Sequence, residues 1–99
     1  MKIDYKHNLE AEEAYERISH LLLDMQEKYA NKISDPEMTW NDQHTKMDYS
    51  VKVMGALVSG QAILKPGSIS FDAKLPFMAR MFSKKIEAMV REQLKDLFS

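Results

Sequence analysis

Apolar and polar residues alternate along five stretches of the chain, and this period of two is typical of strands with one buried face. The clearest stretch covers residues 46–53, where the apolar members are Met47, Tyr49, Val51 and Val53. Residues 2–7, 38–40, 57–64 and 69–75 show the same alternation less regularly. We therefore predict five strands, with Asp35-Pro36 as a break before the second one, because proline disfavours the helical conformation in the residue before it.

Two further segments have apolar residues at helical spacing, which predicts helices with one buried stripe. The first begins near Leu9 and contains Ala14, Ile18, Leu21, Leu22, Met25 and Tyr29. The second begins at Pro76, whose missing N–H suits the first turn of a helix, and contains Phe82, Ile86, Met89, Val90, Gln93 and Leu97. Each segment is predicted as one continuous helix. Glu13–Arg17 and Asp24–Lys28 are expected to form ion pairs one turn apart.

The order of these elements predicts the fold class. Strands with one dry face need helices to cover them, so the order β-α-β-β-β-β-α predicts a single α+β domain over residues 1–99. Its architecture is expected to be two layers, an antiparallel sheet of about five strands with two helices on one face. Lys65-Pro-Gly-Ser68 fits a type II turn between the last two strands. Gly60 within a strand indicates a bulge or a close packing point.

Composition then excludes several classes of function. The net charge of −1 gives no overall field that attracts nucleic acid, and the absence of cysteine removes thiolate chemistry and disulfides. The first residues lack the apolar core of a secretory signal, and the longest apolar run, Leu21–Leu23, is far too short for a transmembrane segment. We expect a cytoplasmic protein.

The sequence contains no constellation typical of catalysis. His7, His20 and His44 lack mutual metal-ligand spacing, and the carboxylates fall on predicted wet helix faces. No metal, cofactor or enzyme activity is therefore expected, and His7 is interpreted as organising the junction between the first strand and the first helix. Lys84, Lys85, Arg80 and Arg91 form a mild basic patch; a solvated face is favoured, although Arg80 and Lys84 are spaced to touch one phosphate or an acidic partner.

The junction of the last strand and the last helix carries a dense apolar cluster. We call this cluster the apolar junction; it consists of Leu75, Phe77, Met78, Met81 and Phe82. These side chains cover most directions around a helix, so the domain can bury only about half of them. One interpretation makes Phe82 and Met78 core residues and the rest ordinary exposed surface. The other makes Phe77 and Met81 an exposed patch for self-association or an apolar partner.

Three groups of residues resemble one protein family. They are His7-x-Leu9 with Glu13-Ala14, then Trp40-x-Asp42, and finally Leu75 through Ile86-Glu87 to Leu94-x-x-Leu97. Together with Gly60, they make the chain similar to the polyhydroxyalkanoic acid system proteins, small bacterial proteins associated with polyester granule regions. The resemblance implies no enzyme activity and no catalytic residues. This chain departs from the family in having Pro76-Phe77 where a glycine is usual.

Two functional hypotheses follow from these observations. The first is a non-enzymatic binding or structural protein that uses the apolar junction to contact a polyhydroxyalkanoate granule surface or a second copy in a homodimer. The alternative is a small carrier that holds a lipid or hydroxyacyl ligand between the sheet and the last helix. In that alternative Trp40 and Tyr49 face the ligand cavity, although a core anchor is the favoured role for Trp40.

Overall fold

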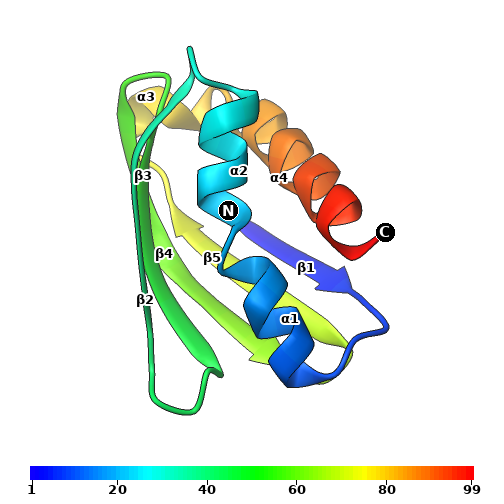
Figure 1. Cartoon of the computed structure of the whole chain (residues 1–99). Coiled ribbons are helices and arrows are strands. Elements are labelled where there is room, and N and C mark those ends of the chain that lie inside the picture. The colour runs from blue at the N-terminus through cyan, green and yellow to red at the C-terminus, as the bar shows by residue number, and fades with distance from the viewer.

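Five antiparallel strands form one sheet, and every helix that covers it lies on the same face (Figure 1). The computed structural model describes residues 1–99. The strands are β1 (Lys2–Lys6), β2 (Ile33–Trp40), β3 (Lys46–Val53), β4 (Ala56–Lys65) and β5 (Ser68–Lys74). The helices are α1 (Ala11–Ile18), α2 (Leu21–Lys28), α3 (Phe77–Arg80) and α4 (Ser83–Phe98). The predicted α+β class is confirmed.

The sheet order is β1-β5-β4-β3-β2, so the first strand lies at one edge beside the last strand. Helix α2 packs over β2, α1 over β4 and α4 over β1, with α4 also contacting both α1 and α2. The core lies between these two layers. Its largest fully buried side chains are Ile3, Ile18, Leu21, Met47, Ile69 and Leu94. None of the helices is long and apolar enough to cross a membrane.

The first helical segment is divided, which corrects the prediction of one continuous helix. Helix α1 ends at Ile18 and α2 begins at Leu21. The Ser19 hydroxyl donates to the Tyr15 carbonyl at 2.8 Å, and the His20 N–H bonds to Arg17, three residues back. Back-bonding by serine competes with the regular helical pattern and bends helices. The apolar stripe continues through the bend, so periodicity alone did not reveal it.

The last helical segment and the second strand also differ from the prediction. Helix α3 ends at Arg80, and Phe82 (φ −107°, ψ 13°) separates it from α4. Asp35-Pro36 does not precede the second strand as predicted but lies within β2. The register of β2 against β3 shifts between Ser34 and Glu37, and Asp35 has φ +51°. The extra residues of this bulge take up the proline without ending the strand.

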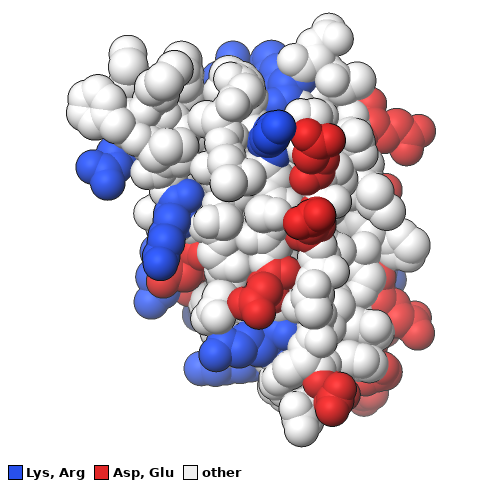
Figure 2. Space-filling model, turned by 90° about the vertical axis from the view of Figure 1, so that its left-hand side faces the viewer, with Lys and Arg blue, Asp and Glu red and all other residues white.

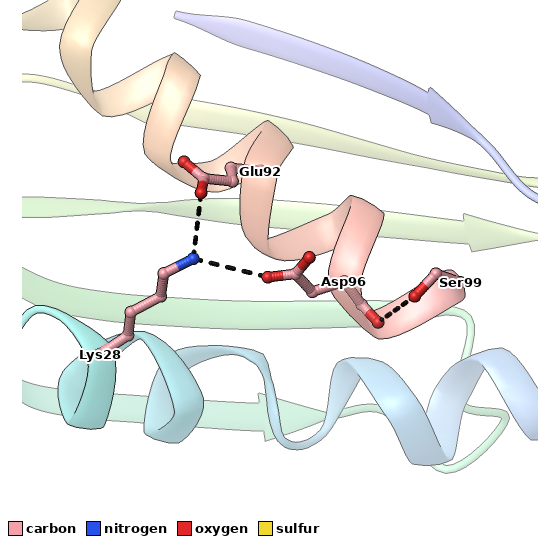
Figure 3. Close-up of polar contacts among 4 residues, drawn as sticks. All are labelled: Lys28, Glu92, Asp96 and Ser99. Atoms are coloured by element: carbon pink, nitrogen blue, oxygen red, sulfur yellow. Dashed lines mark hydrogen bonds and ion pairs between the residues drawn. The ribbon is translucent and has the colours of Figure 1, made fainter.

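Helices α2 and α4 are joined by an ion-pair cluster that the sequence pattern did not predict (Figure 3). The Lys28 ammonium on α2 contacts Glu92 at 3.2 Å and Asp96 at 3.5 Å, both on α4. The bond to Glu92 is the main cause that raises the pKa of Lys28. The predicted pair with Asp24 does not form, whereas the Glu13–Arg17 pair is present at 3.1 Å.

Candidate functional site

The apolar junction begins where β5 ends and lies at one end of the molecule (Figure 1). Pro76 (φ −63°) caps the single turn of α3, and its carbonyl accepts hydrogen bonds from the N–H groups of Ala79 and Arg80. Ala79 is buried and contributes the inward side of that turn. A helix of one turn can bury only one side, so its other side chains point outward.

Most of the apolar junction is exposed to solvent. The exposed fraction is 80% for Phe77, 74% for Met78, 80% for Met81 and 43% for Phe82. Leu75 is half-buried. The interpretation that placed Met78 and Phe82 in the core is therefore wrong, because Ala79 is the residue that α3 buries.

A shallow apolar groove separates α3 from the β3–β4 turn. Residues 53–56 form one wall, residues 76–79 with Met81 and Phe82 form the other, and Ile86 also lines the groove. Both walls are almost entirely apolar, and the groove opens directly beside the exposed side chains of Phe77 and Met81. Apolar surface therefore extends from the apolar junction across the groove to the neighbouring β3–β4 hairpin.

Met54 in that hairpin has an unfavourable backbone conformation. Val53 pairs with Ala56, so Met54 and Gly55 form a two-residue turn, with φ +52° and φ +83°. Positive φ at both positions defines a type I′ turn, where Asn-Gly is the preferred sequence. An L-residue other than Asn, Asp or Gly costs about 1–2 kcal/mol in this region. Met54 thus places an apolar side chain at the groove at the expense of turn stability.

Tyr49 and Trp40 do not share a cavity. Tyr49 lines an apolar cavity of about 40 Å³ between the sheet and the helices, together with Leu21, Met25, Val58, Phe71 and Met89. Trp40 packs instead against Tyr15, with ring centroids 4.9 Å apart, and Tyr15 stacks on His44 at 3.7 Å. Trp40 is partly buried against the core, in keeping with its predicted anchoring role.

His7 has the structural role that the sequence indicated. Its Nδ1 accepts a hydrogen bond from the Leu9 N–H at 3.1 Å, and its backbone N–H bonds to the Gly67 carbonyl at 2.9 Å. The imidazole is buried and stacks on Phe98, with ring centroids 4.8 Å apart. These contacts fasten the end of β1 to the β4–β5 turn and to the last residues of α4.

The remaining titratable groups do not gather into a catalytic arrangement. His44 lies 3.4 Å from Glu12, and no group of three or more His, Asp or Glu side chains is placed to hold a metal ion. The residues that sequence reasoning missed are Met54 and the cations Lys2 and Lys74 near the apolar junction. The pair Met54-Gly55 between two alternating stretches was the available signal for the turn.

The family described as "Putative polyhydroxyalkanoic acid system protein" matches residues 1–98, which is nearly the whole chain. Neither the curated proteins nor the solved structures gave a significant match.

Proposed function

Because the chain belongs to the polyhydroxyalkanoic acid system protein family, we propose that it is a non-enzymatic binding protein that attaches to the surface of polyester granules through the apolar junction. The observation that carries this proposal is the exposure of Phe77 and Met78 on α3 and of Met81 directly after it. Attachment to such a granule implies a cytoplasmic location for the protein. The proposal assigns no catalytic role and no cofactor.

Burial of these side chains supplies a sufficient driving force. Removing one Phe or Met side chain from water contributes about 1.5–3 kcal/mol. Three such side chains contribute roughly 5–9 kcal/mol before the cost of association, which can consume much of this. Weak, reversible attachment is the expected result for one copy, and many copies on one particle would hold it more firmly through avidity.

The strain at Met54 supports a binding role independently of exposure. A side chain that occupies an unfavourable backbone region persists when the structure gains something from its presence. Met54 contributes apolar surface to the groove beside α3, whereas the smaller, polar residues that suit this turn would not. The apolar junction and the β3–β4 turn therefore form one contact surface in this proposal.

Binding to particles of amorphous polyhydroxyalkanoate tests the proposal. Phe77→Asp/Met81→Asp is expected to abolish co-sedimentation with the particles. Leu23→Asp/Leu57→Asp is the matched control, because both leucines are 57% exposed and neither belongs to the apolar junction or lines the groove beside α3. Equal binding by the two double variants would overturn the proposal, and circular dichroism establishes that both remain folded.

Self-association is the second use of the same surface. Light scattering after size exclusion, at several concentrations, measures the mass of the wild type and of the Phe77→Asp/Met81→Asp variant. A wild-type dimer that becomes a folded monomer in the variant would assign the apolar junction to a homodimer interface. A wild-type monomer leaves the junction available to the granule.

The carrier alternative requires a larger interior space than the protein has. Ligand sites usually enclose about 300–1,000 Å³, whereas the cavity beside Tyr49 measures about 40 Å³. A hydroxyacyl or lipid chain would have to move the helices away from the sheet to enter. The entirely apolar lining is the one observation that favours this alternative, and the volume favours the surface-binding function.

A further inference from the structure

The segment that carries the apolar junction is unusual in its charge. Between Ala73 and Ile86 the chain contains Lys74, Arg80, Lys84 and Lys85 and neither Asp nor Glu, although acidic residues outnumber basic ones in the chain as a whole. The charged residues that are near the exposed apolar side chains in sequence are therefore all positive. A purely apolar contact does not need this arrangement.

A second groove, which we call the basic groove, brings four cations together. Lys2, Lys74, Arg80 and Lys84 line this groove, which runs between β1, the end of β5 and the start of α4. Its single carboxylate belongs to Glu87, and that group already pairs with Arg91 at 2.9 Å on the same helix. The four cations have no carboxylate partner within 4 Å, so their charge remains available.

Further cations lie on the other side of the apolar junction. The Lys85 ammonium is close enough to Lys32 to lower the pKa of Lys32, through both a side-chain contact and charge repulsion. Lys32 lies next to the apolar groove, because its carbonyl accepts a hydrogen bond of 2.7 Å from the N–H of Met54, which lines that groove. The two ammonium groups therefore repel each other without a neutralising carboxylate.

Figure 2 shows this distribution on one face of the molecule. Uncharged atoms protrude at the upper left, at the height of α3, with blue atoms below them and along the top. Red atoms lie to the right, some at the height of the protrusion and others lower down, and a red group also lies beside the blue atoms on the left. Apolar protrusion and surrounding positive charge are the two properties of proteins that bind anionic membrane surfaces, where apolar side chains enter the acyl boundary and cations meet the phosphates.

We infer that the apolar junction binds an anionic lipid layer, with the Phe77, Met78 and Met81 side chains inserted among the lipids and the phosphate groups held by the cations of Arg80, Lys84 and Lys85. This inference rests on the proposed function, since it specifies the chemistry of the surface that the same residues contact. It makes an anionic phospholipid layer at the granule surface the immediate partner.

A bare polyester surface and a second copy of the chain would each explain the exposed apolar residues, but neither explains the cations. A neutral polyester offers no counter-charge to them. A second copy joined by a two-fold axis would present the same patch to itself, and this would bring Arg80 and Lys84 toward cations of the same kind. An anionic lipid layer complements both properties at once.

Flotation with vesicles tests the inference. The wild type is expected to float with vesicles of phosphatidylcholine and phosphatidylglycerol in equal amounts, and at least about tenfold less with vesicles of phosphatidylcholine alone. Arg80→Glu/Lys84→Glu/Lys85→Glu should lose at least about tenfold in affinity for the anionic vesicles. Added salt should weaken wild-type binding because it screens the charges.

A control with the same change in net charge separates the local effect from the global one. Lys6→Glu/Lys46→Glu/Lys65→Glu reverses three exposed cations without ion-pair partners, at the far ends of β1, β3 and β4 from α3. This variant should keep most of the binding. Equal losses in the two triple variants, or equal flotation of the wild type with neutral and anionic vesicles, would overturn the inference.

The outcome remains distinguishable from failure of the proposed function. Wild-type protein that co-sediments with bare polyester particles, but does not float with anionic vesicles, would retain the proposed function and reject the lipid layer. Flotation that survives in Phe77→Asp/Met81→Asp would reject insertion by the apolar junction. Circular dichroism and thermal melting of each variant exclude unfolding as the cause of a loss.

Discussion

The Tyr49 hydroxyl on β3 donates a hydrogen bond of 3.1 Å to the backbone carbonyl of Asp72 on β5. These two strands are not neighbours, and the side chain reaches across β4 at Gly60, which pairs with Tyr49 on one side and Ala73 on the other. The Tyr49 ring also meets Phe71 edge-on, with centroids 6.1 Å apart. Three strands are thus joined through one side chain that crosses a glycine.

Gly60→Ala is expected to destabilise the protein by about 3 kcal/mol. A Cβ at this position would collide with the Asp72 carbonyl oxygen and crowd the Ala73 Cα, and backbone atoms of a paired strand cannot rotate away. Urea denaturation measures the loss. Gly55→Ala is the control, because its Cβ meets nothing within 4 Å and only its positive φ of 83° is costly, at about 1–2 kcal/mol. Equal losses at the two positions would contradict the steric explanation.

Alkaline pH is expected to destabilise the fold through Tyr49. Burial, and secondarily the negative charge of Asp72, raises the pKa of Tyr49 from 10.0 to about 12. Since the folded pKa lies above the unfolded one, the neutral phenol contributes stability in full below pH 10, and this contribution is lost as the pH rises toward 12. Chemical denaturation of the wild type and Tyr49→Phe across this range measures the difference between them. That difference should shrink or reverse with rising pH, and a constant difference would contradict the shift.

Met54→Asn should stabilise the β3–β4 turn by about 1 kcal/mol, because Asn tolerates positive φ better than Met. The same substitution should weaken binding to polyester particles, since it removes apolar surface from the groove. Denaturation and co-sedimentation are measured on the same preparation. Met54→Leu retains both the strain and the apolar character and should match the wild type in both assays. A destabilised Met54→Asn protein would show that the turn is not under strain.

Val58→Ile is expected to fill part of the cavity between sheet and helices and to raise stability by about 1 kcal/mol. Val58 is buried and lines the cavity directly, and one methyl group fits a space of about 40 Å³. Thermal melting measures the gain. A loss of stability would indicate that the cavity cannot take the methyl group without strain. Retention of any acyl ligand by the wild type, and its loss in Val58→Ile, would favour the carrier alternative.

The strands were predictable because their faces differ sharply in environment. Met47, Val51 and Val53 are buried while the residues between them are not, so the alternation in sequence corresponds directly to the two sides of β3. The type II turn was similarly evident, and Gly67 has φ +82°, as that turn requires. In both cases a local physical requirement determined the residue types.

The helix breaks were not predictable in the same way. Neither Ser19-His20 nor Met81-Phe82 contains a glycine or proline, and the breaks depend on how each segment fits the surface of the sheet. The partner of Lys28 was equally hidden, because Glu92 and Asp96 are more than sixty residues away in the chain. Interactions of this kind depend on tertiary packing and leave no periodic trace.

The sequence identified which residues make up the apolar junction but did not determine which of them are exposed. The sequence indicated an exposed Phe77 and Met81 as one interpretation of two, and it did not indicate that Met78 is also exposed. The contribution of Met54 required knowledge of which hairpin lies beside α3. Likewise, Lys2 and Lys74 join Arg80 only because β1 and β5 are neighbours in the sheet.

The position of β1 at the edge of the sheet also determines when the domain can be completed during synthesis. Its only partner is β5, and the paired residues Lys2 and Asp72 are separated by most of the chain. Ile3, one of the most deeply buried residues, has no strand to rest beside until residues 68–74 have left the ribosome. Pairing over such a sequence separation is slow because the loop must close first. The nascent chain therefore carries β1 without a strand partner until β5 has emerged.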